Sequence, residues 1–559
     1  MSAKSLDKYF SDTAIVRVLC DKRLQSTTTN RHEQFMAGLT CSRPRHVPVE
    51  LDRLLPPRRQ WPRLGRAQRA SKYADPLRAR AELLARYVLK TLRSKKAGSV
   101  WVRRLRAFIA DIRNAALKWS SDMRLSPRQT IGIPKVRPGS GQKYRLVSVY
   151  GLRETVLSSG FAAFLRGRLE PHLGKECLAY RAATRSSPPI SHHDAIGRIH
   201  DYASAKGSAP LWVAECDLRG FFDNLKHSTV RKSIKAILRS DSADDRRARA
   251  FIESFLAGYS FAKGYDEALG RLLSIGVSKP DFGRVIQTGD SRTGVAQGSA
   301  ISCILANAVL FRADRETLRA DSLHTGLFLR YSDDTIFIAP SRQQCASMLG
   351  AYLQAVRGIG LPAHKPADVP PYGAGFWKGK SKKPYKWSMD GRRFSVPWVA
   401  FVGYHVRRDL MIRARPSSIT KELNKQLDVT DHVVSRFVKA AARKKGRFII
   451  RSVAAIRFRA MQHMVAFSVG RPQYRSPAPE PDTLCWGRGF RMLKGSQAAG
   501  FGLARLDRGR QRALGRLVGR VHGLIKSKAL VEGKFNVKSK NPFKLHWPGR
   551  PFSYFRQFL

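Results

Sequence analysis

The sequence predicts an α/β fold of the α+β kind, built from several domains, with basic helical segments at both ends. Length is the first observation, because 559 residues are several times the usual length of one domain. Composition is the second, because 43% hydrophobic and 9% aromatic residues are normal for a globular protein and exclude a wholly disordered chain. The third is that strand-like and helix-like patterns alternate in the middle of the chain.

Composition divides the chain into four stretches, namely 1–125, 126–410, 411–475 and 476–559. The first is expected to be a basic, largely helical extension, because AELLARYVLKTLR repeats apolar residues every three or four positions. The second holds the strands. The third looks helical, and SPAPEPDT at its end is typical of a linker. The fourth is expected to be a basic C-terminal extension.

The charge balance points to an acidic partner. Lys and Arg number 103 against 41 Asp and Glu, a formal net charge of +62. Nucleic acid is the expected partner, because basic side chains neutralise phosphates and release counterions whatever the base sequence. A membrane surface is the alternative.

Membrane insertion and secretion are not expected. The longest apolar stretch, around Ile301 to Phe311, is shorter than the roughly 18 residues that span a bilayer. The N-terminus, MSAKSLDKYFSD, has no hydrophobic segment of a signal peptide. The seven cysteines form no CxxC pair, which argues against zinc modules and a disulfide framework. These features favour a cytoplasmic, reduced protein.

Two segments place acids at the ends of hydrophobic strands. In VAECDLRGFFDNLKH (213–227), a buried-looking strand ends at Asp217. In FLRYSDDTIFIAP (328–340), two apolar runs meet at Ser332, Asp333 and Asp334, which predicts a β-hairpin with carboxylates at its tip. Such acids suit a metal site better than a core.

Nucleotidyl transfer by two metals uses carboxylates of this kind. Mg²⁺ prefers oxygen ligands and is usually held by one or two carboxylates together with substrate phosphates, and Mn²⁺ is an alternative ion. Two such ions about 3.5–4 Å apart clamp the attacking and leaving oxygens. For Asp333 and Asp334 alone, an ordinary hairpin turn is an equal alternative, so the surrounding motifs matter.

A third segment, RTGVAQGSAISCILANAVL (292–310), lies between the two acidic ones and has a glycine-containing loop before a long apolar helix. The order of these segments resembles the reverse transcriptases, closest to the bacterial group II intron, retron and defence-associated branches. The similarity covers about 130–425. Two departures stand out: Ala179-Tyr180-Arg181-Ala182 replaces the Phe-Gly-Phe-Arg that relatives often have, and Ala296 replaces a usual proline.

The resemblance implies a right-hand polymerase fold, with fingers and an antiparallel-sheet palm over 126–410 and a helical thumb over 411–475. It implies that Asp217, Asp333 and Asp334 are the catalytic residues and the metal ligands. The implied nucleotide-binding residues are Lys143 and Arg145 at the triphosphate, Phe222 beneath the sugar, Gln297, Gly298, and Lys365 as proton donor to pyrophosphate. The implied primer grip consists of Phe401, Gly403 and Tyr404.

The function implied is that of an RNA-directed DNA polymerase, which makes DNA from an RNA template and dNTPs. The branch implies a role in antiphage defence with a dedicated non-coding RNA. That RNA is expected at the chain ends, since residues 431–559 hold 28 Lys and Arg against 5 acids. An RNA-dependent RNA polymerase and a catalytically idle RNA-binding scaffold are the alternatives, and a homo-oligomer stays open.

Overall fold

The computed structural model is mixed α and β, and it divides into two compact units. It describes residues 5–39, 50–63, 76–94, 98–125, 129–134, 144–181, 190–258, 292–367, 373–390, 395–443, 448–469 and 497–533. The first unit comprises Met1–Leu19, Glu50–Pro57 and Ala85–Val402. The second comprises Cys20–Val49, Arg58–Leu84 and Gly403–Leu559. Each unit is described by itself.

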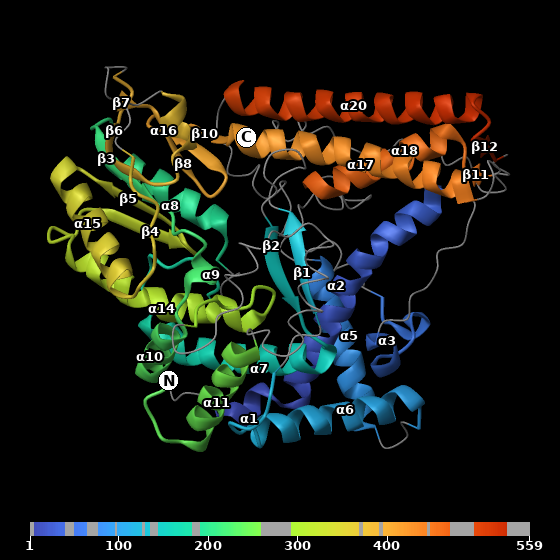
Figure 1. Ribbon diagram of the computed structural model, residues 1–559, viewed down its shortest axis with the longest axis horizontal. Helices are drawn as coiled ribbons and strands as arrows, with labels where there is room; N and C mark the ends of the chain where they lie inside the picture. The colour runs from blue at the N-terminus through green and yellow to red at the C-terminus, as the bar shows by residue number, and fades with distance from the viewer. Residues whose placement is uncertain are drawn as a thin grey trace. The chain divides into compact units, whose positions relative to one another are not determined.

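A five-stranded sheet organises the first unit (Figure 1). The strands are β3 (Leu211–Cys216), β4 (Leu327–Tyr331), β5 (Asp334–Ala339), β6 (Lys382–Trp387) and β7 (Ser395–Val396), in the order β4-β5-β3-β6-β7. Strand β3 runs antiparallel to both β5 and β6, and β6 and β7 are parallel. The central strand, LWVAEC, is apolar enough to be buried between its neighbours.

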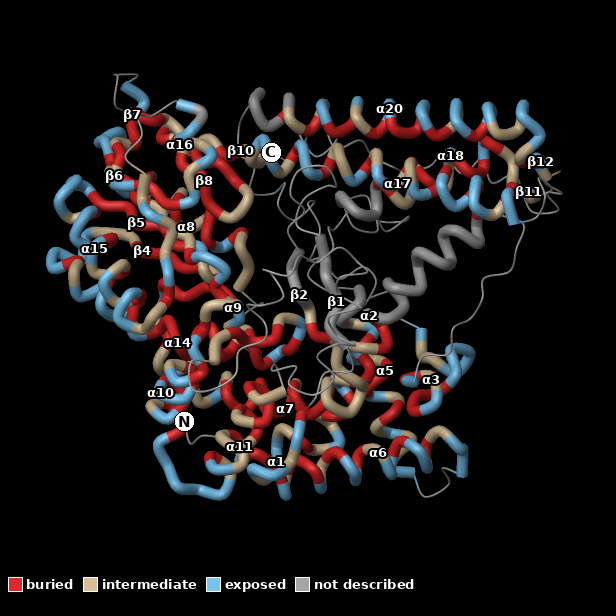
Figure 2. Tube along the Cα trace, in the orientation of Figure 1, coloured by how far each residue is buried: buried red, intermediate tan, exposed pale blue. Residues whose placement is uncertain are grey.

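Helix α15 (Arg342–Gly358) covers one face of this sheet, and a second long helix, α14 (Ala300–Arg319), packs against α15. Helix α15 contacts β3, β5 and β6. Phe328 of β4 stacks on Phe337 of β5 with ring centroids 5.2 Å apart, and Tyr352 of α15 meets both rings. Figure 2 shows the strands buried and the outer side of α15 exposed. The sheet is therefore fixed on one face by an aromatic core.

Helices support the rest of the first unit. Helix α7 (Leu152–Leu169) contacts α1 (Leu6–Tyr9), α6 (Val100–Leu117), α11 (Ala243–Gly258) and α14. At their centre Phe161 stacks on Phe251 at 4.0 Å, with Phe10 and Trp119 at its edges. The unit's other elements are α3 (Leu51–Leu54), β1 (Gln129–Pro134), β2 (Tyr144–Val149), the 3-10 helix η2 (Glu170–His172), α8 (His192–Ala205), α9 (Phe221–Asn224), α10 (His227–Ile237), α16 (Ala374–Lys378) and β8 (Trp398–Phe401).

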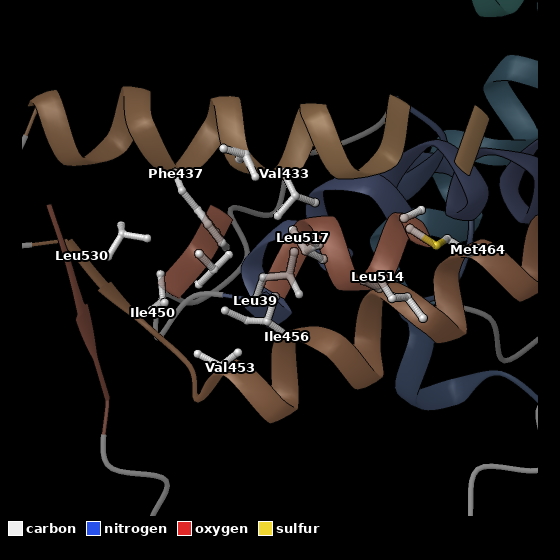
Figure 3. Packing of buried hydrophobic residues seen from close by; sticks show 14 of the residues in the cluster. Leu39, Val433, Phe437, Ile450, Val453, Ile456, Met464, Leu514, Leu517 and Leu530 are labelled. Carbon is white, nitrogen blue, oxygen red and sulfur yellow. The ribbon is translucent and has the colours of Figure 1, made fainter. Parts of the chain in front are cut away.

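The second unit is a helical bundle around one hydrophobic core. Its elements are η1 (Arg58–Gln60), β9 (Tyr404–Arg407), β10 (Ile412–Ala414), α17 (Pro416–Arg443), β11 (Phe448–Ile450), α18 (Val453–Val469), α20 (Gln497–Lys526) and β12 (Leu530–Glu532). Phe437 of α17, Ile456 of α18 and Leu517 of α20 are buried together (Figure 3). The short strands β11 and β12 pair in parallel beside them.

The two compact units divide the chain differently from the four stretches expected from composition, which stay a prediction. Residues 1–125 are shared between the units, and helices α2 (Asp12–Leu39) and α5 (Pro76–Arg93) each contain residues of both. Phe10 is buried in the first unit, whereas Leu39 is buried in the core of the second. In the second unit α20 packs along α17 and α18 in one core, so described helices on either side of residue 475 belong to the same unit. Charge composition alone hides this division, because the apolar faces of the basic helices determine where they pack.

Candidate metal-dependent active site

Strand register brings the three predicted aspartates to one end of the sheet. The last pair between β3 and β5 is Cys216 with Thr335, so Asp217 follows β3 beside Asp334, which begins β5. Ser332 and Asp333 form the two-residue turn of the expected hairpin between β4 and β5. Ser332 has φ of +63°, the left-handed conformation that such tight hairpin turns require.

The negative charge of these side chains is concentrated. Crowding by protein atoms, followed by the charges of Asp333, Asp217 and Glu215, raises the pKa of Asp334 to about 7. Asp334 is exposed to solvent, so a cation can reach it. A bound cation would offset the repulsion between the carboxylates, which is one cause of the raised pKa. The site is thus arranged to attract positive charge.

Two lysines that the sequence analysis missed face the acids of β3. Strand β6 pairs Lys382 with Glu215, and the same antiparallel register sets Lys380 opposite Asp217. The Lys380 Nζ lies 2.8 Å from Asp217 Oδ2, and Lys382 forms an ion pair with Glu215, which also accepts a 2.8 Å bond from the Tyr385 hydroxyl. The sign of these lysines in the sequence is the run KGKSKK (378–383), in which Lys recurs at every second position. Which of them face the acids follows only from the pairing of β6 with β3.

A buried ionic network supports the hairpin formed by β4 and β5. Arg330 of β4 is fully buried and forms bonds of 2.7 and 2.6 Å with the two carboxylate oxygens of Asp314 on α14. It also donates to the Asn307 Oδ1 at 2.9 Å and to the carbonyl of Ser332 at 3.1 Å. Although burial by itself lowers the pKa of Arg330, Asp314 and neighbouring groups raise it on balance. The turn that carries Asp333 is therefore attached to the helix behind it.

The glycine loop contacts the end of β2. The carbonyl of Gln297 accepts a 2.8 Å bond from the Ser148 amide, and its side-chain amide lies 3.4 Å from Asp223 Oδ1. Gly298 has φ of +105°, and a Cβ there would lie 2.6 Å from the Ser148 carbonyl oxygen. Glycine is required on both grounds. Ser299 then caps α14, as the predicted loop-to-helix transition requires.

The two phenylalanines after Asp217 differ in burial. Phe221 is only 2% exposed and belongs to the core. Phe222 is half-buried, contacts Phe221 edge-to-face, and its carbonyl accepts a 2.8 Å bond from Val295. This bond ties the segment after Asp217 to the glycine loop.

The remaining predicted residues lie in several places. Lys365 is exposed, and its neighbour His364 donates a backbone bond of 2.9 Å to the Asp217 carbonyl. Arg145 lies in β2 opposite Ile133, whereas Lys143 lies outside the described residues.

The expected primer grip falls on the boundary between the units. Phe401 is buried and ends β8 in the first unit. Gly403, with φ of +92°, and Tyr404 belong to the second unit, where Tyr404 begins β9. Of the predicted residues, the structure brings the three aspartates to one end of the sheet, where Lys380 contacts Asp217.

The chemistry of the donors fits a hard divalent cation, although the protein does not form a closed ligand set. Within the described ranges, no three His, Cys, Asp or Glu side chains are grouped so that they hold a metal by themselves. Mg²⁺ usually takes one or two carboxylates and completes its shell with substrate phosphates and water. Asp217, Asp333 and Asp334 supply oxygens of that type at one edge. Such a site suits a metal shared with the substrate.

Comparison with known proteins does not assign this chain to a family. No family model matches the chain, and no curated protein matches it. Telomerase from Candida albicans, in complex with a TWJ fragment of telomeric RNA, is 12% identical over 83% of this chain and 75% of its own, with a TM-score of 0.28.

Two structures of telomerase from Candida tropicalis are similar to the same degree. Apo telomerase is 10% identical over 76% of this chain and 70% of its own, with a TM-score of 0.30. A form truncated from the C-terminal domain is 12% identical over 61% and 68%, with a TM-score of 0.28. At these scores the likeness carries no argument about fold or function.

In the described part of the chain, no helix is long and apolar enough to cross a membrane.

Proposed function

We propose that this protein is a metal-dependent nucleic-acid polymerase of the reverse transcriptase type. The observation that carries the proposal is the register of β3 and β5, which sets Asp217 beside Asp334 with Asp333 in the adjoining turn. The raised pKa of Asp334 supports it, because repelling carboxylates at a solvent-reachable edge are stabilised by bound cations.

Asp217, Asp333 and Asp334 would hold the metal ions. Two bound Mg²⁺ ions supply charge stabilisation for the attacking and leaving oxygens of the transferred phosphate. Asp217 and Asp333 are the main ligands proposed, while Lys380 provides a positive charge 2.8 Å from Asp217 on the other side. We therefore propose Lys380, in addition to Lys365, as a lysine that contacts the triphosphate or pyrophosphate.

The direct test is primer extension by the full-length protein with Mg²⁺. Asp333→Ala and Asp217→Ala are expected to lower incorporation by at least about a thousandfold, because the loss of metal contacts removes transition-state stabilisation. The matched control is Asp241→Ala, since that carboxylate is also in the first unit and its side chain is 95% exposed. Its activity is expected to stay at the wild-type level.

The same measurement separates the enzyme from an idle scaffold. Circular dichroism and retention of labelled nucleic acid are expected to stay unchanged in the Asp333→Ala protein, since the turn residue is not part of the core. Full incorporation by Asp333→Ala would refute the site assignment. A wild-type protein that binds nucleic acid but incorporates no nucleotide under any metal condition would favour the scaffold.

For the partner, we propose a dedicated non-coding RNA, used in antiphage defence and bound by the basic parts of the chain. The exposed side chains of the second unit support this. Those of α17 include Lys421, Lys425, Lys439 and Arg443, and those of α20 include Arg505, Arg512 and Lys526. Figure 2 shows exposed residues recurring along the described part of α20. Arg and Lys in such rows bind phosphates.

Crosslinking and sequencing from phage-infected cells test the partner. One enriched small RNA is expected, and it is expected to persist in the Asp333→Ala protein but to be lost when the exposed Lys and Arg of α20 are changed to Gln. A random sample of cellular RNA at physiological salt would leave only a non-specific basic surface.

A further inference from the structure

Tyr180 has a backbone conformation that its side chain disfavours. Its φ is +61°, in the left-handed region where a bulky L-residue is strained and glycine is preferred. It is also the only exposed Phe, Tyr or Trp in the described part of the chain, with 37% of its surface accessible. A strained and exposed aromatic side chain is a costly choice for an ordinary turn.

The neighbours on both sides hold this conformation in place. The Ala179 carbonyl accepts a buried bond of 2.8 Å from the side-chain amide of Asn307. Arg181 donates to Glu170 Oε1 at 2.7 Å and to the Gly174 carbonyl at 2.6 Å. Strained residues persist where the surroundings over-determine them, and such residues gather at functional sites.

The hydroxyl group anchors the ring to the catalytic hairpin. It lies 3.5 Å from the Ser332 Oγ, one residue before Asp333, and it also bonds with the Cys303 side chain. Burial of this end of the side chain raises the pKa of Tyr180 to about 12, so the hydroxyl stays protonated and able to donate. These bonds fix the hydroxyl end, while 37% of the residue's surface stays accessible to a ligand.

The fold by itself needs neither the ring nor the strain. Glycine would adopt the same φ without cost, and the bonds of Ala179 and Arg181 would remain. We propose that the Tyr180 ring is a stacking platform for a nucleobase at the end of the primer–template next to Asp333. This inference rests on the proposed function, because it places the polymerised nucleic acid at the same hairpin. Aromatic rings suit this role, since every base presents a face on which they stack.

The test compares Tyr180→Gly, Tyr180→Asn and Tyr180→Phe in the full-length protein. Glycine and asparagine tolerate the left-handed conformation and remove the ring, whereas phenylalanine keeps the ring and loses the hydroxyl. The control is His324→Gly, because His324 is also exposed with a positive φ of +50° but lies in the loop before β4. It relieves similar strain without removing the proposed platform.

The probe is an RNA–DNA primer–template, titrated without nucleotides and followed by fluorescence anisotropy. Tyr180→Gly and Tyr180→Asn are expected to bind it about tenfold more weakly than the wild type, with an unchanged melting temperature. Tyr180→Phe and His324→Gly are expected to bind within about twofold of the wild type. An abasic template residue at the primer end is expected to weaken wild-type binding about tenfold and to add nothing in Tyr180→Gly.

The outcomes separate the platform from the enzyme. If a folded Tyr180→Gly or Tyr180→Asn protein binds like the wild type, or responds fully to the abasic residue, the platform is refuted and the polymerase stands. If the wild type shows the abasic effect through Tyr180 yet incorporates no nucleotide, the platform stands and the polymerase is refuted. Loss of binding in Tyr180→Phe would also overturn the proposal, because the hydroxyl rather than the ring would then matter.

Discussion

Replacing Arg330 by methionine is expected to loosen the hairpin formed by β4 and β5, which carries the proposed metal ligands Asp333 and Asp334. The side chains of Arg330 and Asp314 are 0% and 2% exposed, so the change leaves a buried carboxylate that has lost its two bonds of 2.7 and 2.6 Å. Breaking a buried pair by removing one partner costs about 3–5 kcal/mol. The same change frees the Ser332 carbonyl, which is part of the turn that presents Asp333.

A double variant isolates the ion pair. Replacing Arg330 by Met and Asp314 by Leu together is expected to restore most of the lost stability, because an apolar pair carries no unpaired charge. Polymerisation is expected to stay reduced, since the bonds to Asn307 and Ser332 are still missing. The exposed pair of Arg231 and Glu253 provides the control, where Arg231→Met is expected to cost less than about 1 kcal/mol.

Urea unfolding and hydrogen exchange measure these changes. The free energy of unfolding is followed by tryptophan fluorescence, to which Trp212 of β3 and Trp387 of β6 in the same sheet contribute. Hydrogen exchange of peptides covering 327–339 reports the hairpin directly. If Arg330→Met loses no more stability than Arg231→Met and its hairpin stays protected, the network does not support the site as described.

Three further predictions concern the same unit. Gly298→Ala is expected to destabilise the protein by more than about 1 kcal/mol in thermal unfolding, because its φ is +105° and a Cβ would lie 2.6 Å from the Ser148 carbonyl. Gly350→Ala in the interior of α15, with nothing within 4 Å of the added Cβ, is expected to stabilise it slightly, and equal effects would contradict this view. Without metal the pKa of Asp334 is raised to about 7, so its ionised form costs stability as pH rises from about 4 to 7. A metal needs that ionised form, so Mn²⁺ binding measured by calorimetry is expected to tighten from pH 6 to pH 8 and to release a proton, and a pH-independent affinity would refute it. Phe222→Ala is expected to admit ribonucleotides in single-nucleotide incorporation, because the resemblance implies that this half-buried ring lies beneath the sugar, where a bulky side chain would exclude a 2′-hydroxyl. Equal use of rNTPs and dNTPs by the wild type would favour an RNA polymerase.

Local sequence patterns determined the elements that carry the candidate site. The apolar run before Asp217 and the two runs around Ser332 each encode a strand, because alternating or continuous apolar residues bury well in a sheet. The hairpin between β4 and β5 joins neighbouring residues, so its turn was predictable from the sequence. The same holds for the glycine loop before α14, where a short polar segment precedes an apolar helix.

Only the tertiary structure decided which distant segments of the chain contact these elements. The pairing of β3 with both β5 and β6 joins segments more than a hundred residues apart, and without it Lys380 and Lys382 are only two charges in a basic run. The partnership of Arg330 with Asp314 likewise depends on how α14 packs beneath the sheet. The core into which each basic helix near the chain ends packs was also decided by the tertiary structure. The basic residues describe the solvent-exposed side of these helices, whereas their packing depends on which apolar faces fit together. Local backbone preferences are encoded within a few residues, whereas pairing between distant segments is decided by packing and burial across the whole unit.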